Sequence, residues 1–381
     1  MTTQISQVTR RYDLDWLRVI TIITVFFFHT ARFFDTGGWH LKNLVRYQGF
    51  QDFTDLLIVW IMPMMFVISG AAIYYGFQKG KAGKFLKDKV LRLLVPVVVG
   101  MFTHSILQIY FDALTNNRFE GSFIAFIPHY FEGIFPFGGN FSVTSVHLWY
   151  LEVLFIFCLL FLPIFIWWKG SGQKFCQAVG NFLAKPGALY LLALPTMILA
   201  TILDPSNIGM KETGGWSVIV YIFFFLPGYI FIPNEAVQTR LMKQRWISIV
   251  LALFFSFAWL SQDDHAFGST GYMIDSILIS LAAWSCIFAL LGIVRRYLTF
   301  TNPFLSYANE AVLPFYILHQ PVILSVGFFV AGWAIPAIGK YLIMLICAFI
   351  VIMVIYEFLV RRFNVMRFLF GMKPKSKSTV Q

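Results

Sequence analysis

The sequence predicts an all-α, polytopic integral membrane protein with about ten transmembrane helices. Hydrophobic residues make up 59% of the 381 residues and charged residues 12%, whereas a soluble domain carries about 25% charged residues. The mean hydropathy is +0.73. Because a helix needs about 20 mostly apolar residues to cross a bilayer, the chain is long enough for many spans.

Ten apolar runs, each bounded by charged or Gly/Pro-rich segments, predict the spanning helices. No small-residue cleavage site follows the first run, so we expect that helix to be retained rather than removed as a signal peptide. The fifth run is short and the tenth begins gradually, which leaves nine or eleven spans open. The runs are residues 16–34, 56–76, 91–111, 147–168, 187–203, 216–232, 246–261, 272–294, 311–332 and 340–360.

The basic residues lie mostly on one side of this ten-span arrangement. That side, which includes both termini, receives 23 of the 29 Lys and Arg residues. The positive-inside rule then places both termini in the cytoplasm. This topology also explains the net charge of +11 better than nucleic-acid binding does, so we expect a lipid bilayer and no nucleic acid as a partner.

We expect a single membrane domain over residues 1–381, with a cytoplasmic N-terminal segment at 1–15 and a basic cytoplasmic tail at 361–381. The sequence shows no internal repeat and no appended soluble domain. Two outer segments, 35–55 and 112–146, are candidates for lids over the outer mouth. The cysteines lack the spacing of a metal or redox site, so we expect core packing and no metal; they are Cys158, Cys176, Cys286 and Cys347.

Arg18 and His29 are the first candidates for function. Eleven residues separate them, which on a helix is ~1100° of rotation and roughly 17 Å of rise, so both lie on one face. This spacing places Arg18 at one membrane surface and His29 near the middle, where an ionisable group is costly and suggests function. Histidine can act as a general base towards a hydroxyl. The alternatives are an arginine that anchors the helix at the interface and a histidine bonded to a neighbouring helix.

A basic connection after the second run contains Lys89 and Arg92, spaced i, i+3 on one predicted helix face. Such a pair suggests a site for a polyphosphate ligand such as coenzyme A. The alternative is a topology signal that also attracts anionic lipid.

The fourth run opens with His147, Trp149 and Glu152. An aromatic residue near the outer interface fits an anchoring belt, with one buried carboxylate deeper in the helix. The functional alternative is a surface for a sugar hydroxyl acceptor.

The ninth run carries Glu310 near its start and His319 nine residues later, which is ~13 Å along a helix. His319 therefore reaches a depth close to that of His29. Pro321 is expected to loosen this helix by removing a backbone hydrogen bond. Other buried polar residues show no partner in the sequence; they are His104, Gln108, Asp275 and Glu357.

Taken together, these blocks resemble the membrane acyltransferase family 3 over about residues 10–374. The blocks that carry the resemblance are the Arg18-x10-His29 spacing, FVISG (66–70), RLLVP (92–96), HLWYL (147–151) and FYILHQPVI (315–323). Within the family, the chain is most similar to a subgroup that modifies periplasmic glucans with succinyl groups. TGGWH (36–40), FFFLPGYIF (223–231) and the tail at 355–374 carry that narrower likeness.

The resemblance implies a bacterial inner-membrane enzyme that takes an acyl group from cytoplasmic acyl-CoA, such as succinyl-CoA or acetyl-CoA. It passes this group to a hydroxyl of a periplasmic or cell-surface glycan, and glucan-synthesis membrane proteins are possible partners. By position, His29 matches the catalytic histidine and Arg18 its partner arginine. Lys89 and Arg92 match a basic pair in which the family often has arginine at the first position. Lysine cannot make bidentate phosphate contacts.

These expectations give a mechanism in which two roles of His29 stay open, and one alternative function without chemistry. Acyl-CoA binds with its phosphates near Arg18, Lys89 and Arg92, and its thioester reaches His29, which either deprotonates the acceptor or carries the acyl group. His147, Trp149, Glu152 and His319 are candidates for binding the acceptor or orienting His29. The rival is a transporter or flippase without chemistry, which buried ionisable groups fit equally well.

Overall fold

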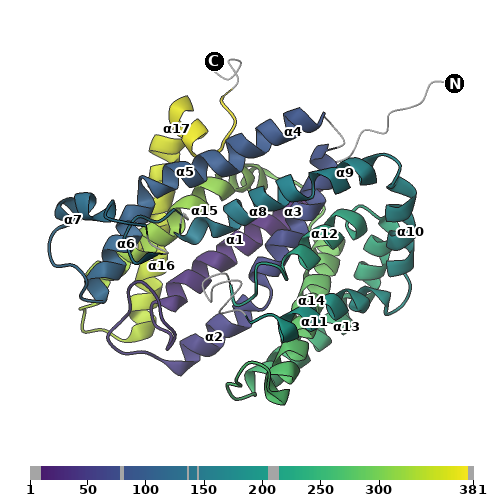
Figure 1. Cartoon of the computed structure of the whole chain (residues 1–381), viewed down its shortest axis with the longest axis horizontal. Coiled ribbons are helices and arrows are strands. Elements are labelled where there is room, and N and C mark those ends of the chain that lie inside the picture. Colours follow the sequence, from purple (N-terminus) through teal and green to yellow (C-terminus); the bar gives the residue numbers. More distant parts are fainter. Residues whose placement is uncertain (1–9, 78–80, 135–136, 144–145, 205–213, 376–381) are drawn as a thin grey trace. The chain divides into compact units, whose positions relative to one another are not determined.

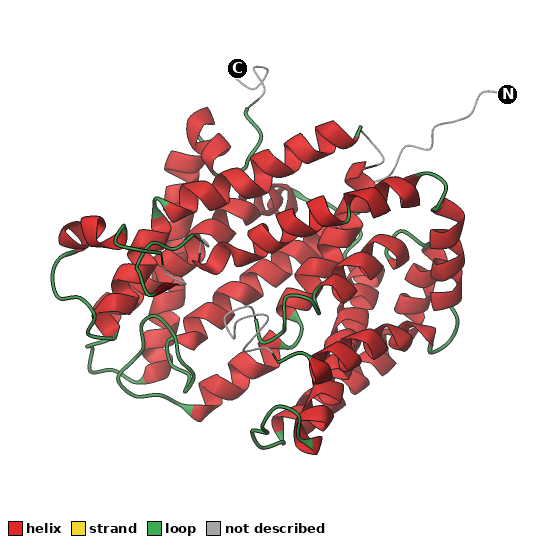
Figure 2. Cartoon of the chain, viewed as in Figure 1, coloured by secondary structure: helices red, strands yellow, loops and turns green. Residues whose placement is uncertain are grey.

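The computed structural model describes residues 10–77, 81–134, 137–143, 146–204 and 214–375. Helices joined by loops and turns make up this part of the chain, and it contains no strand (Figure 2). A single isolated bridge pairs Ile134 with Phe141. The all-α class predicted from composition is confirmed.

Six helical segments are long and apolar enough to cross a bilayer within the described residues. They are α1 (Tyr12–Arg32), α2 with α3 (Gln48–Ile58 and Ile61–Phe77), α13 (Glu235–Leu260), α14 (Thr270–Tyr297), α15 (Pro303–Val330) and α16 with the π-helix η5 (Ala337–Ile355 and Tyr356–Val360).

Three further candidates are helix pairs bent by 43°, 57° and 119°, so the count reaches nine if each pair is one span. The first pair joins α4, the π-helix η1 and α5 (Ala82–Lys89, Val90–Leu94 and Val95–Met101) to α6 (His104–Thr115). The second joins η3 and α8 (Val146–Leu148 and Trp149–Leu160) to α9 (Leu162–Lys169). The third joins α10 (Gln173–Leu183) to η4 and α11 (Ala188–Leu192 and Ala193–Ile202).

The remaining predicted run, 216–232, contains α12 (Ile222–Phe231). A helix of 10 residues rises about 15 Å, half of the hydrocarbon thickness. Each of the ten apolar runs contains a helix, but the helix in this run is too short to span alone. Which side of the membrane holds the termini stays a prediction, and residues 1–9 and 376–381 of the predicted terminal segments lie outside the described residues.

The predicted lids are partly helical. Segment 35–55 ends in the first turns of α2, which begins at Gln48. Segment 112–146 contains the end of α6 and all of α7 (Phe123–Tyr130). Neither segment is an extended loop throughout.

The chain folds as two compact units, each assembled from three segments. The first unit comprises residues 1–21, 59–85 and 161–309, and the second comprises residues 22–58, 86–160 and 310–381. That the chain forms a single membrane domain stays a prediction.

The first unit is built on two close helix pairs. In one, α3 meets α12 at two glycines: a Cβ on Gly70 would lie 2.0 Å from the Phe225 carbonyl oxygen, and one on Gly228 would lie 2.3 Å from that of Val67. In the other, α13 and α14 lie side by side (Figure 1). Small residues that let backbones approach are typical of helix packing in membranes.

Arg11 ties the start of α1 into the first unit. Its guanidinium binds Asp13 with two hydrogen bonds of 2.7 and 2.9 Å and also donates to the Tyr75 hydroxyl and the Gln238 side chain, both at 3.0 Å. Burial lowers the pKa of Arg11, but the bond and charge of Asp13 and the contact with Tyr75 outweigh this and raise it. Arg11 thus stays charged and fixes one end of α1.

The second unit has an aromatic core where α6 and α7 meet. Tyr110 and Phe126 pack with ring centroids 5.5 Å apart, and the Tyr130 hydroxyl donates to the Met101 carbonyl at 2.8 Å. Trp39 packs against this core from the segment between α1 and α2. That packing brings the segment towards the last turn of α1, where His29 lies.

Candidate active site

His29 stands in the last turn of α1, a helix that runs unbroken from Tyr12 to Arg32. The polar hydroxyls of Thr21 and Thr30 are satisfied within the helix, because they donate to the carbonyls of Leu17 and Phe26 at 2.7 and 2.9 Å. The Nδ1 of the His29 imidazole, in contrast, is buried without a hydrogen-bond partner among the described residues.

His319 on α15 lies beside His29, as their predicted depths suggest. The two ring centroids are 5.0 Å apart, with 47° between the ring planes. The α15 helix continues through Pro314 and Pro321 to Val330. Two histidines from helices far apart in the sequence thus meet inside the second unit.

The hydrogen bonds of His319 decide its tautomer. Its Nδ1 lies 2.5 Å from the Tyr316 carbonyl oxygen, and a carbonyl can only accept, so Nδ1 carries the proton. In the neutral ring Nε2 then carries no proton and has a free lone pair. This atom is buried without a hydrogen-bond partner within the described part of the chain. His319 can therefore accept a proton at Nε2.

His147 continues the arrangement beyond His319, at 5.3 Å between ring centroids. Its Nε2 donates to the Ile317 carbonyl at 2.9 Å, and its Nδ1 faces the Gln108 amide nitrogen at 3.0 Å. Both ring nitrogens are thus occupied, so His147 is locked as the Nε2–H tautomer. In this tautomer His147 has no free lone pair that could accept a proton.

The backbone around His147 is held under strain. The Tyr316 hydroxyl donates to the His147 carbonyl at 2.6 Å, and Val146, the preceding residue, has a φ of +41°. A β-branched residue with positive φ costs on the order of 1–3 kcal/mol and persists where the surroundings over-determine it, often at functional sites. The contacts of His147 supply such surroundings.

His104 on α6 is the fourth histidine, 5.9 Å from His147 between ring centroids. We call His29, His319, His147 and His104 the histidine row. Sequence reasoning noted His104 and Gln108 without partners and did not consider Tyr316. The spacing of His104 and Gln108, one helical turn apart in an apolar run, is the signal that could have placed them on one face towards His147.

Trp39 lies beside His29, the first candidate base. Its ring is nearly parallel to that of His29, with 19° between the planes and 6.1 Å between centroids. The TGGWH motif thus reaches the histidine row through its tryptophan.

The predicted phosphate-binding residues each have a local setting of their own. Arg18, in the α1 segment of the first unit, is 3.5 Å from the Asp15 carboxylate. Lys89 ends α4, and Arg92 lies exposed in the π-helix Val90–Leu94. Because this turn is a π-helix, the i, i+3 spacing of a regular helix does not describe the pair; π-bulges recur at functional sites.

The other predicted residues find local places. Trp149 and Glu152 lie half-buried on α8. Glu310 binds Arg367 at 2.8 Å. Asp275, which had no partner in the sequence, binds His265 at 2.8 Å, and Glu357 binds Arg361 at 2.9 Å. Among the described residues, no three His, Cys, Asp or Glu side chains are grouped to hold a metal ion.

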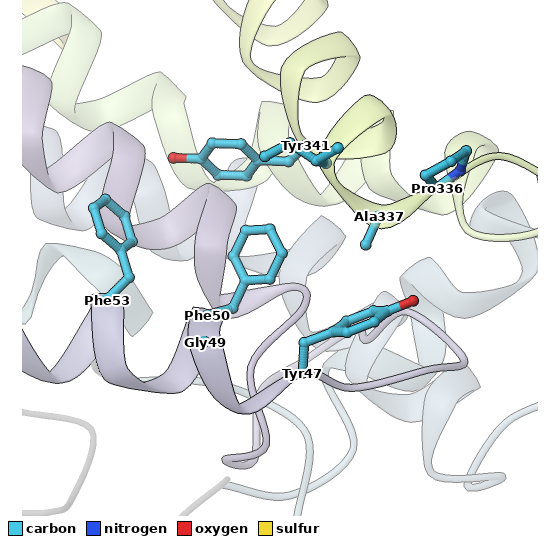
Figure 3. Close-up of a pocket in the computed structure, with 8 residues that line it drawn as sticks. Tyr47, Gly49, Phe50, Phe53, Pro336, Ala337 and Tyr341 are labelled. Carbon is cyan, nitrogen blue, oxygen red and sulfur yellow. The ribbon is translucent and has the colours of Figure 1, made fainter.

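An apolar cavity of about 660 Å³ lies in the same unit, between the start of α2 and the start of α16. Figure 3 shows Tyr47, Phe50 and Phe53 facing Tyr341 and Pro336 across it. Apolar residues and two tyrosines, Tyr47 and Tyr341, line it, and none of these lining residues is charged.

Comparison with known proteins gives a match over most of the chain. The family described as an acyltransferase domain matches residues 11–357. Glucans biosynthesis protein C of Salmonella heidelberg is 22% identical over 380 residues, covering 97% of this chain and 96% of the relative. The protein of the same name from Salmonella schwarzengrund is 23% identical with the same coverage. No solved structure matches the chain.

Proposed function

This chain belongs to the acyltransferase family 3, and we propose that it moves a succinyl or acetyl group from acyl-CoA to a hydroxyl of a periplasmic or cell-surface glycan. The protein is a multi-pass membrane acyltransferase, which favours the enzyme over the transporter that sequence alone left open. The names of its relatives support a glucan as the acceptor, and the bacterial inner membrane is the proposed location.

The contact between His29 and His319 is the observation that carries the proposal. In the reaction, the acceptor oxygen attacks the thioester carbonyl, and an imidazole takes the hydroxyl proton. The carbon–sulfur bond then breaks, and the same proton neutralises the departing thiolate of coenzyme A. The His29 Nδ1 and the His319 Nε2 have no hydrogen-bond partner among the described residues. Either imidazole is therefore suited to receive and return that proton.

A second form of the reaction keeps His29 as the acyl carrier. Here an imidazole nitrogen attacks the thioester, coenzyme A leaves, and the acceptor hydroxyl then displaces the imidazole. Trapping acyl-His29 with acyl-CoA in the absence of glycan separates this form from direct transfer.

Acyl-CoA is the proposed co-substrate, with Arg18, Lys89 and Arg92 as the residues that would contact its phosphates. Arginine suits phosphate because its planar fork binds two oxygens at once, whereas lysine acts as a point charge. His147, Trp149 and Glu152 are proposed to contact or frame the acceptor. Membrane proteins of glucan synthesis are the proposed source of that acceptor.

The test is acyl transfer by the full-length protein in lipid nanodiscs, with labelled succinyl-CoA and acetyl-CoA offered separately and a periplasmic glucan as acceptor. We expect label in the glucan with wild type and none with His29→Ala. His265→Ala is the matched control, because His265 pairs with Asp275 in the first unit. Equal transfer by wild type and His29→Ala would overturn the role of His29, and no transfer from either donor would overturn the proposed reaction.

A further inference from the structure

We propose that Asp35 is a positioning residue: it holds residues 33–47, which we call the strap, so that Trp39 sets the orientation of the His29 ring. The inference rests on the proposed function. It assigns to the strap a role in aligning the base, beyond covering the site.

His29 needs such a device because its Nδ1 lacks, within the described part of the chain, the hydrogen bond that anchors Nδ1 of His319 and of His147. His319 is held through Nδ1 by a carbonyl, and His147 is held through both nitrogens. The Nδ1 of His29 has no hydrogen-bond partner among the described residues. An imidazole without that anchor can rotate about its side-chain bonds, so ring contacts must restrict it.

Trp39 supplies a ring contact that can restrict the His29 imidazole. Its ring lies 19° from parallel to the His29 ring at 6.1 Å between centroids, within the usual range for aromatic pairs. The indole also packs against the buried core that includes Tyr110 and Phe126, and its centroid lies 6.2 Å from that of His40, so it is itself held in place. Trp39 can therefore transmit a fixed orientation to His29.

Asp35 fixes the start of the strap. Its side chain is completely buried and receives hydrogen bonds from Arg32 at 2.6 Å, from Thr54 at 3.3 Å and from Lys42. A buried carboxylate persists only with such partners, because an unpaired charge in that place is very costly. Asp35 thus joins the end of α1, the strap and α2.

Further bonds close the strap on both sides of Trp39. Arg32 also donates to the Gly38 carbonyl at 2.5 Å, directly before Trp39. The Gly37 amide donates to the Gln51 side chain at 3.0 Å. After Trp39, the Asn43 amide donates to the Phe33 carbonyl at 2.9 Å. Loss of the Asp35 charge leaves Arg32 and Lys42 without their shared partner, so the strap should move as a whole.

The direct readout is the reactivity of His29 itself. Full-length protein in nanodiscs is treated with diethyl pyrocarbonate, and modification of each histidine is followed by mass spectrometry. We expect Asp35→Asn and Trp39→Ala to speed modification of His29 severalfold while His265 is unaffected. Leu44→Ala, at an exposed strap position, is the matched control and should react as wild type does.

Activity provides the second readout. With strap variants we expect kcat to fall, by up to about 10²-fold for a misplacement of about 1 Å, with an unchanged KM for acyl-CoA. Trp39→Phe should recover much of kcat, because it restores a flat ring.

The outcomes separate the two proposals. Unchanged His29 reactivity in both Asp35→Asn and Trp39→Ala would overturn the positioning role, whatever the activity. If Asp35→Asn fails to fold, Trp39→Ala and Trp39→Phe decide the matter, since both leave the Asp35 bonds intact. Faster His29 modification in variants of a protein that transfers no acyl group would support the strap and refute the proposed reaction.

Discussion

His29 and His319 meet at 5.0 Å between ring centroids, and Nδ1 is hydrogen-bonded in His319 but has no partner in His29 among the described residues. His319 is fixed by the Tyr316 carbonyl and presents a lone pair, whereas His29 is oriented by ring contacts. The pair therefore combines a rigid acceptor of protons with a base whose position depends on its surroundings.

Replacement of His319 by Asn tests whether the Nε2 lone pair of His319 takes part in proton transfer. The Asn side-chain amide can still donate towards the Tyr316 carbonyl, so the fold should be kept, but the Nε2 lone pair is lost. We expect acyl transfer to fall by about 10²–10⁴-fold, the usual contribution of a positioned acid or base. His129→Asn, at a histidine outside the row, should retain activity; full activity in His319→Asn would exclude a proton-transfer role.

The glycine contact between α3 and α12 predicts a sharp difference between two substitutions in one helix. Gly70→Ala places a methyl group against the Phe225 carbonyl, and we expect a loss of about 1–3 kcal/mol or more in stability. Gly76→Ala meets nothing within 4 Å and should be neutral or stabilise by about 0.5–1 kcal/mol. Melting curves of both variants in the same detergent compare them, and equal melting temperatures would contradict the predicted close contact.

The ion pair of Arg11 and Asp13 predicts a strong effect on the first unit. Arg11→Ala leaves the buried Asp13 carboxylate without its bidentate partner, which costs about 3–5 kcal/mol when a buried pair is broken. Arg10→Ala removes a pair whose arginine is 63% exposed, worth about 0–1 kcal/mol. Unfolding by increasing SDS measures both, and a similar loss in the two variants would argue against this assignment.

Lys42 predicts a pH dependence of stability. Burial lowers its pKa from 10.5 to about 8, against the opposing bond and charge of Asp35. Below about pH 8 Lys42 is protonated in both the folded and the unfolded chain. Its contribution to the free energy of unfolding therefore does not change with pH in that range. Between about 8 and 10.5 the unfolded chain binds more protons, and this group makes the free energy of unfolding rise with pH.

Comparison of variants isolates that contribution. Lys42→Met should lose the rise in melting temperature between pH 8 and 10, whereas Lys84→Met, at an exposed position in α4, should keep it. A slope shared by wild type and Lys42→Met would assign the dependence to another group.

Local sequence patterns were enough for much of the architecture. Runs of apolar residues must form helices in a bilayer, because every backbone amide and carbonyl needs a partner within the segment. Because a helix rises by a fixed distance per residue, the positions of His29 and His319 along their helices predicted similar depths. The short α12 shows where this reasoning fails: residues 216–232 are apolar apart from Ser217, but the helix occupies only Ile222–Phe231.

Partners far apart in the chain required the folded structure. Helical rise places a residue along an axis, but it does not say which helices are neighbours or which face each turns to the other. The bond between Gln108 and His147, the tautomer of His319 and the contact of Trp39 with His29 all depend on that packing. Sequence periodicity therefore specified the helices and their candidate histidines, whereas the packing of side chains from α1, α6 and α15 and the strap determined which of them form a site.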